Sequence, residues 1–377
     1  MRFPISDFRL PILKCAASGG MTFEFIFGRG ASILWRSHQV FKSAIGNRQS
    51  AILALLLAGL TGCQKQEPMD TLVIYSAGPR ELAEWTCNEF EKETGSHTKL
   101  FCATTGEVMA KLQAEEFHPN ADMILLASST AAEALKQAGR FAPLPDLSAL
   151  PIRPEWTDPE HFYTGTSASA LGIAVRKDRA NDILDWNDVY SGKVSGAIIM
   201  PSPSQSGTSA EFVTASHVVI GEPFWKGLET AKKNSLQISG PNSQALSSLI
   251  LGSHVAVLAA ADYLVFKQIE KGEPLAMIFP ASGCPIIPRP IAILNNSHNP
   301  RLAEKFVRFC FSQRVQERIA KEHLIPADTR IALSSLRKQA ANLNAMPLDP
   351  AQAVKIQREV LRRFRYEIER TKPGASE

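Results

Sequence analysis

From residue 71 onward, short apolar runs of strand length alternate with longer stretches in which apolar residues recur at helical spacing. The run at 71–77 is typical of a buried strand, and 79–94 is typical of a helix that begins at a proline and ends before Gly95. The alternation continues with expected strands at 98–103 and 122–126 and expected helices at 106–116 and 128–138. Such a rhythm predicts an α/β fold with a parallel sheet and helices on both faces.

A stretch rich in proline and aromatic residues at 141–163 interrupts the alternation, and 282–290 is a second segment punctuated by prolines. Between and after them we expect strands at 172–176, 197–201, 254–259 and 291–294, and helices at 184–190, 207–219, 223–233, 242–251, 262–270, 300–310 and on to 323. A last amphipathic helix is expected at 350–370 with Asp349 as its N-cap. Its arginines predict a solvated face paired with neighbouring glutamates.

An apolar run at residues 51–60 follows three basic residues and leads directly into Leu60-Thr61-Gly62-Cys63. The run is too short to span a bilayer, and this order of basic, apolar and small residues is typical of a secretory leader. The four-residue segment has the pattern of a lipobox, whose cysteine becomes acylated when the leader is removed. We therefore expect 1–63 to be a lipoprotein signal peptide with an N-terminal extension, and Cys63 to carry a lipid anchor. The alternative is a short buried helix that ends in Gly-Cys.

The charge of the chain lies mainly in this leader. The whole chain is 45% hydrophobic and 21% charged, with a formal net charge of +4. Residues 1–63 contain seven Lys or Arg and two acidic residues, so the remainder has 34 basic and 35 acidic residues. Nucleic-acid binding requires a basic surface, so no nucleic-acid partner is expected.

Four further cysteines match no metal-binding spacing: Cys87, Cys102, Cys284 and Cys310. In an oxidising compartment, a local Cys87–Cys102 disulfide is one expectation and buried free thiols are the other. We expect neither a metal nor a cofactor.

Several short motifs carry a resemblance to a known family. They are Val73-Ile74-Tyr75-Ser76-Ala77, Phe90-Glu91-Lys92-Glu93-Thr94-Gly95, Thr105-Gly106-Glu107, Lys111-Leu112, Ala121-Asp122, Ser206-Gly207-Thr208 and Pro290-Ile291-Ala292-Ile293-Leu294. In their order and spacing, the chain resembles the type II periplasmic binding proteins, in the branch of the ferric-iron, 2-aminoethylphosphonate and sugar-phosphate binders. The resemblance implies two parallel-rich α/β domains joined by two crossover strands, with a ligand in the cleft between them.

The resemblance also implies a domain organisation and partners. The expected parts are a tether at 64–70, a first domain at 71–165 plus 291–330, a second domain at 166–290, and a helical tail at 331–377 that packs on the first domain. The implied partners are a small anionic solute and the permease subunits of an ABC importer, which would read closure of the hinge. We expect a monomer, anchored by lipid to a membrane in the periplasm or cell envelope.

The loop at 201–209 is the richest candidate for binding. It follows an expected strand and opens an expected helix, so free backbone N–H groups lie at the positive end of the helix dipole. Gly207 permits close approach of a ligand, while Ser206 and Thr208 add hydroxyl groups. This chemistry suits a phosphate, phosphonate or carboxylate, although serine and threonine also cap helices that bind nothing.

Similar loops follow other expected strands and would face the same cleft. Their candidate ligand-binding residues are Ser76, Ala77, Thr105, Gly106, Ser128 and Asn242. Each by itself is typical of a helix cap, but their recurrence after successive strands indicates a polar cage.

Asp262 and Tyr263 complete the set of candidate ligand-binding residues. The iron-binding relatives carry two adjacent tyrosines as metal ligands at this position, and here only Tyr263 remains. Ferric iron needs several hard anionic oxygens, so the resemblance favours an anionic solute and leaves ferric iron as an alternative. Asp262 is expected either to receive an ammonium group of the solute or to be a solvated residue at a helix start. Arg289 is expected either to pair with an anionic ligand or to lie on the surface near the hinge.

Motifs of common enzyme classes are missing from the sequence. It contains no G-x-S-x-G, H-E-x-x-H or G-x-x-x-x-G-K-[ST] segment. We therefore expect a binding protein and not an enzyme, with a non-transport lipoprotein that senses a solute or bridges envelope proteins as a further alternative.

Cys63→Ser is expected to release the protein from membranes, because the buried acyl chains supply the anchoring free energy. Intact-mass measurement of membrane-extracted protein should find Cys63 as an acylated N-terminus. Unmodified protein that still carries residues 1–62 would contradict the lipobox interpretation.

Overall fold

The structure, a computed structural model, describes residues 71–192, 194, 196–338 and 343–370. The expected leader, its lipobox and the tether lie outside these residues. Within the described ranges, no helix combines the length and the apolar character that a membrane span requires.

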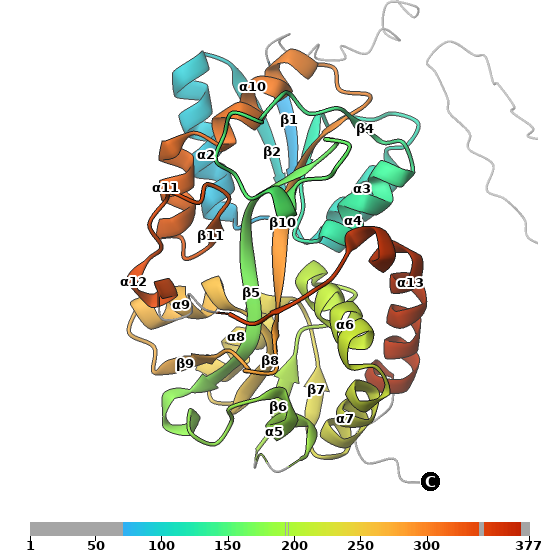
Figure 1. Cartoon of the computed structure of the whole chain (residues 1–377), viewed down its shortest axis with the longest axis vertical. Helices are drawn as coiled ribbons and strands as arrows, with labels where there is room; N and C mark the ends of the chain where they lie inside the picture. Colours follow the sequence, from blue (N-terminus) through green and yellow to red (C-terminus); the bar gives the residue numbers. More distant parts are fainter. Residues whose placement is uncertain (1–70, 193, 195, 339–342, 371–377) are drawn as a thin grey trace, which may run out of the picture. The chain divides into compact units, whose positions relative to one another are not determined.

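One sheet of 12 strands runs through the described part of the chain (Figure 1). Its main path is β2 (His97–Cys102), β1 (Thr71–Ser76), β3 (Met123–Leu125), β10 (Cys284–Leu294), β5 (Thr164–Arg176), β8 (Ala256–Ala261), β6 (Ile198–Met200) and β7 (Leu236–Ile238). Shorter strands pair beside this path: β4 (Phe141–Ala142), β9 (Leu275–Ile278), β11 (Ile325–Pro326) and β12 (Ala345–Met346). β1 pairs in parallel with β2 and β3, and β6 with β7 and β8, so the expected α/β fold is confirmed.

Two long antiparallel strands, β5 and β10, separate the two parallel parts of the sheet and run through the middle of the molecule (Figure 1). β10 pairs with β3 on one side, and β5 pairs with β8 on the other. We call β1–β4 and the helices that cover them the first lobe, and β6–β9 and their helices the second lobe. β5 and β10 belong to both.

Both long strands extend beyond what the sequence predicts. The expected strand at 172–176 is only the end of β5, whose first residues are small and polar and therefore lack an apolar pattern. The prolines at 282–290 predicted a break, yet β10 includes most of that segment. The pairing of β10 with β5 shifts in register between Pro288 and Pro290, and Arg289 lies at this irregularity.

Helices cover both faces of each lobe (Figure 1). In the first lobe, α2 (Arg80–Thr94), α10 (Pro300–Cys310) and α11 (Gln313–Lys321) lie opposite α3 (Thr105–Ala114) and α4 (Ser129–Gln137). In the second lobe, α5 (Trp186–Tyr190), α6 (Gly207–Ile220) and α7 (Glu222–Lys233) lie opposite α8 (Asn242–Ile250) and α9 (Asp262–Glu270). Short 3₁₀ turns are η1 (Pro154–Trp156) and η2 (Lys177–Arg179).

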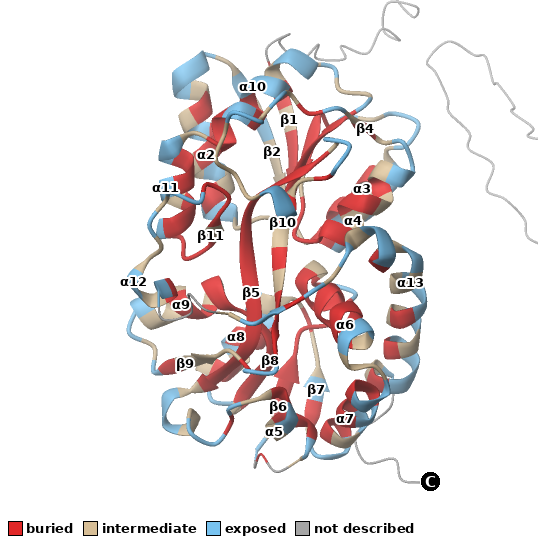
Figure 2. Ribbon diagram, viewed as in Figure 1, coloured by how far each residue is buried: buried red, intermediate tan, exposed pale blue. Residues whose placement is uncertain are grey.

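Alternating side chains of β1 explain why the sheet holds helices on both faces. Leu72 and Ile74 pack into the core on the α2 side, whereas Tyr75 packs with Val108 and Leu112 of α3. β1 is therefore buried on both sides, and exposed residues lie mainly on the outer faces of the helices (Figure 2).

The tail forms α12 (Ser335–Lys338), α13 (Pro350–Arg363) and the π-helical turn η3 (Phe364–Glu369). Asp349 caps α13 by accepting a hydrogen bond from the Ala351 backbone N–H, which confirms the expected N-cap. The expected pairing of arginines with glutamates is present at Arg363–Glu367. The tail was expected on the first domain; α13 contacts α4 of the first lobe and equally α6 of the second (Figure 1).

The four described cysteines are free thiols, so the structure contains no Cys87–Cys102 disulfide. Three of them are buried, and burial raises the pKa of the Cys87 thiol to about 12.

Phe90→Ala should lower the free energy of unfolding by about 3–5 kcal/mol, because it leaves a cavity in the first lobe. Phe90 is 1% exposed, and its ring lies edge-on to those of Phe306 (5.0 Å) and Phe309 (5.5 Å). Phe117→Ala is the matched control, since Phe117 is 87% exposed. Urea denaturation that shows equal losses in the two variants would contradict this packing.

Candidate functional site

The loop before α6 caps its helix and meets the start of α8. Ser206 is the N-cap, and its Oγ accepts a hydrogen bond from the Ser209 backbone N–H (3.1 Å). The same hydroxyl lies 3.0 Å from Thr208 Oγ1 and 3.2 Å from Asn242 Oδ1, and Asn242 Nδ2 donates to Thr208 Oγ1 (3.0 Å). Three sequence-predicted site residues thus form one hydrogen-bonded cluster.

Gly207 lies at one of the points where the second lobe touches the first. A Cβ at this position would lie 2.6 Å from Thr105 Oγ1 and 3.1 Å from the Ala127 carbonyl oxygen. A Cβ on Gly106, in the first lobe, would lie 3.0 Å from the Ser204 carbonyl oxygen. At Gly207 the Thr105 side chain and the Ala127 carbonyl leave no room for a Cβ, whereas at Gly106 the Ser204 carbonyl would have to shift slightly.

The loop after β1 is held by local bonds. Ser76 Oγ accepts a hydrogen bond from the Gly78 N–H (3.1 Å), and the Ala77 N–H donates to the Leu125 carbonyl oxygen (2.7 Å). Ser76 is buried, and it lies at the boundary between the first lobe and β5 because it shares a cavity with Thr166 and Ser167.

A glutamate from the second lobe occupies the N-terminus of α4. Ser128 Oγ donates to Glu211 Oε1 (2.6 Å), and Thr130 donates from its backbone N–H (2.9 Å) and from Oγ1 (2.9 Å). Glu211 is 1% exposed, and burial raises its pKa above the ordinary value while these hydrogen bonds act in the opposite direction. Ser128, a sequence-predicted site residue, therefore binds a carboxylate of the protein itself.

Asp262 is paired with the tail. Its Oδ2 accepts hydrogen bonds from the Ala170 backbone N–H (2.9 Å) and from Arg337 Nη1 (2.5 Å), and Asp262 is fully buried. Arg337 also donates from Nε to the His323 carbonyl oxygen (3.0 Å). Asp262 was expected either to receive an ammonium group or to be solvated at a helix start. Neither role matches this carboxylate, which is ion-paired in the core.

Arg289 has the opposite character, a buried charge without a protein partner. It is 4% exposed, and its Nε and Nη1 have no hydrogen-bond partner within the described chain. Its guanidinium lies over the ring of Tyr263, 5.0 Å from the centroid. The residue lines a cavity of about 50 Å³ together with Ser76, Thr166 and Ser167. Its burial rules out the surface location that was one of the two expectations.

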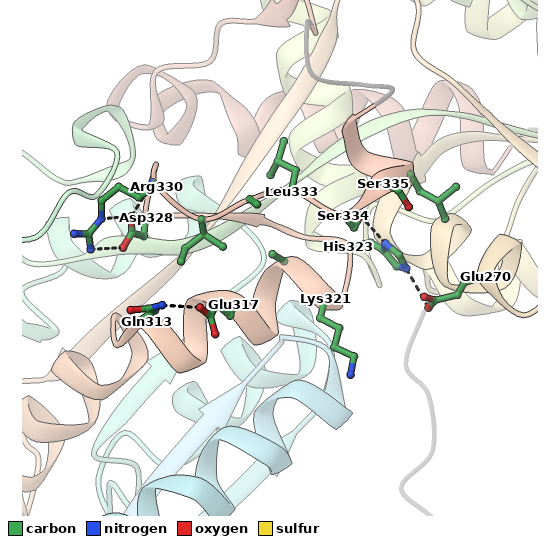
Figure 3. A pocket seen from close by; sticks show the side chains of 14 residues that line it. Glu270, Gln313, Glu317, Lys321, His323, Asp328, Arg330, Leu333, Ser334 and Ser335 are labelled. Carbon is green, nitrogen blue, oxygen red and sulfur yellow. Dashed lines mark hydrogen bonds and ion pairs between the residues drawn. The ribbon is translucent and has the colours of Figure 1, made fainter.

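Other pockets of the described chain are wider. One of about 750 Å³ lies between α11 and the segment after it, where His323 contacts Ser334 and Glu270, and Arg330 pairs with Asp328 (Figure 3). None of the sequence-predicted site residues lines it. Another of about 1050 Å³ includes Glu211 and Arg337 among its lining residues. In the described part of the chain, no three His, Cys, Asp or Glu side chains gather as a metal site would require.

Sequence reasoning missed Glu211 and Arg337. Glu211 is the single charged side chain on the first three turns of a helix of small and apolar residues, most of them buried, and a charge in such a helix indicates a specific partner. Arg337 carries no comparable indication, because it lies in a short polar helix among surface residues.

Comparisons with known proteins agree with this architecture. A sequence profile described as bacterial extracellular solute-binding protein matches residues 71–324. A probable ABC transporter periplasmic-binding protein, y4fP of Sinorhizobium fredii, is 24% identical over 300 residues, which is 74% of this chain and 81% of that protein. The periplasmic binding protein AfuA of Actinobacillus pleuropneumoniae, solved with fructose-6-phosphate bound, aligns with a TM-score of 0.72 and 20% identity over 80% of this chain and 99% of its own. Iron-bound HitA of Pseudomonas aeruginosa aligns with a TM-score of 0.69 and 22% identity over 77% and 99%.

Arg337→Met is expected to lower the free energy of unfolding by about 3–5 kcal/mol, because it leaves the Asp262 carboxylate buried without its cation. Arg362→Met is the matched control, since that side chain is 67% exposed and pairs with an exposed glutamate, a contact worth about 0–1 kcal/mol. Urea denaturation compares the two. Similar small losses in both variants would contradict the buried ion pair.

Proposed function

Because the chain belongs to the bacterial extracellular solute-binding proteins, we propose that it captures a small anionic solute, such as a phosphonate or a sugar phosphate, between its two lobes. The family and the relatives support a periplasmic solute-binding protein of an ABC transporter. Proteins of similar fold have been solved with a sugar phosphate or with iron bound. The anionic nature of the solute is the proposed step.

The observation that carries this proposal is the unpaired guanidinium of Arg289. An ion removed from water costs several kcal/mol unless a partner of opposite charge compensates it. Arginine offers a planar set of N–H donors that match carboxylate, phosphonate and phosphate oxygens. Ser76 and Ser167 line the same cavity and would add hydroxyl donors to an oxyanion there.

The size of the cavity indicates how the solute would bind. About 50 Å³ holds an anionic end group, whereas pockets for whole small molecules are roughly 300–1,000 Å³. The lobes are in contact at Gly207 and Thr105, so a larger solute would need them to separate about β5 and β10. In this proposal, the anionic group lies at Arg289 and the rest of the solute lies toward Ser206, Thr208 and Asn242.

Ferric iron is the alternative, since several structural neighbours are ferric-iron-binding proteins and HitA was solved with iron bound. Fe³⁺ requires several hard anionic oxygens. Tyr263 lies beneath the Arg289 guanidinium, whose charge would repel a cation at the phenol ring, and Asp262 is committed to Arg337. AfuA, which has a similar fold, was solved with a sugar phosphate. These contacts favour the anion.

The remaining expectations complete the proposal. The two lobes would be the two expected domains, 71–165 plus 291–330 and 166–290, with 331–377 as the tail. The lipid on Cys63 would hold a monomer at a membrane beside its permease.

Arg289→Met should weaken the binding of the solute by about 3 kcal/mol, roughly 100-fold, because the anion loses its buried counter-charge. The variant should fold with undiminished stability, since it removes an unpaired buried charge. Calorimetry with the first hit from a thermal-shift screen of inorganic phosphate, methylphosphonate, fructose 6-phosphate, citrate and ferric chloride measures this effect. Arg301→Met, a change at an exposed position, is the control.

Unchanged affinity in folded Arg289→Met protein would move the site elsewhere. If only ferric chloride shifts the melting temperature, and a visible tyrosine–iron absorption band appears with it, the iron alternative is correct.

A further inference from the structure

The contact between Glu211 and α4 joins the two lobes directly. We propose that Glu211 is a latch, a carboxylate of the second lobe that holds the lobes together by occupying the N-terminus of α4 in the first lobe. This interaction needs no solute. It therefore holds the two lobes in contact when no solute is bound.

The geometry at α4 is that of a bound anion. Both carboxylate oxygens of Glu211 accept hydrogen bonds, at 2.6 Å from Ser128 Oγ, 2.9 Å from the Thr130 N–H and 2.9 Å from Thr130 Oγ1. α4 has nine residues, and the positive end of its dipole lies at these donors. Within the described chain, no lysine or arginine forms an ion pair with Glu211, so the helix end is its partner.

The contact spans the cleft and is not internal to one lobe. Glu211 is 83 residues from Ser128 in the sequence, and it projects from the second turn of α6. The next contact between the lobes, from Gly207 to Thr105, lies at the start of the same helix. Separation of the lobes would expose the Glu211 carboxylate and its three donors to water. Closure would require these groups to lose that water again.

The latch also restricts where a solute can place its charge. The hydroxyl and N–H donors of α4 are already used by Glu211, so an anionic group retains Arg289 as its charged contact. This consequence rests on the proposed function. The latch itself does not, because its donors and acceptor are all protein atoms.

Glu133 provides a matched control. It lies on α4, is 6% exposed, and its carboxylate accepts hydrogen bonds from Tyr163 Oη (2.9 Å) and Gln137 Nε2 (3.0 Å). All three residues precede β5, so Glu133→Gln perturbs a buried carboxylate of the same type without touching the contact between the lobes.

The test is amide hydrogen–deuterium exchange of the whole protein without any added solute, in wild type, Glu211→Gln and Glu133→Gln. A local role would speed exchange only in the peptide that contains 128–131. The latch predicts exchange about tenfold faster also in the peptides that contain 103–108 and 202–208, which meet at another contact between the lobes, in Glu211→Gln alone.

Exchange that stays at the wild-type rate in 103–108 and 202–208 of folded Glu211→Gln protein would overturn the proposal, as would an equal acceleration in Glu133→Gln. If Glu211→Gln does not fold, Thr130→Val removes one hydroxyl donor with little change of shape and should show the same pattern at smaller amplitude. A wild-type pattern in that variant would likewise overturn the latch. Because no solute is used, the result does not depend on whether the solute is an anion.

Discussion

The antiparallel pairing of β5 with β10 positions the other parts of the candidate site. Each lobe attaches its parallel strands to one of these two strands, through β3–β10 and β5–β8. The helices that follow the parallel strands in both lobes therefore begin in one shared space, where Gly207 meets Thr105. The register shift beside Pro288 and Pro290 lies in this same pairing, and it places Arg289 at the junction of the lobes.

Three buried charges near this junction have different environments. Asp262 is neutralised by Arg337 of the tail, and Glu211 is held by the N-terminus of α4. Arg289 alone has guanidinium nitrogens without a partner in the described chain. A buried charge that protein groups compensate supports the fold, whereas one that they do not compensate is a candidate for binding, because a ligand can supply what the protein lacks. For this reason, Arg289 is the proposed contact of the solute, and Glu211 is the proposed contact that holds the lobes together.

The tail adds a further link between the lobes. α13 contacts both α4 and α6, and Arg363 forms an ion pair with Glu222 of α7 while its guanidinium lies 4.4 Å from the centroid of the Trp225 ring. Arg337, also in the tail, reaches the start of α9. Any separation of the lobes has to keep or exchange these contacts, so the amplitude of opening depends on the tail as well as on β5 and β10.

Local patterns in the sequence were sufficient for most of the fold. The helix at 79–94, the strands at 98–103 and 122–126 and the Asp349 cap all lie where the spacing of apolar residues and the capping chemistry place them, within a few residues. The local composition of strand-to-helix loops also singled out Ser206, Thr208 and Asn242, which the structure joins by hydrogen bonds. β5 and β10 were underestimated, since small residues and prolines lack the apolar alternation by which a strand is recognised.

The sequence by itself thus determined the α/β alternation, the family and the polar loops at the starts of helices, because each is encoded in residues close together along the chain. Only the tertiary structure decided which charges are compensated. Glu211 and Ser128 are 83 residues apart, and Asp262 and Arg337 are 75 apart, so no local pattern could pair them. The partners became identifiable only once the two lobes and the tail were in contact, since the free energy of a buried charge depends on what surrounds it in space.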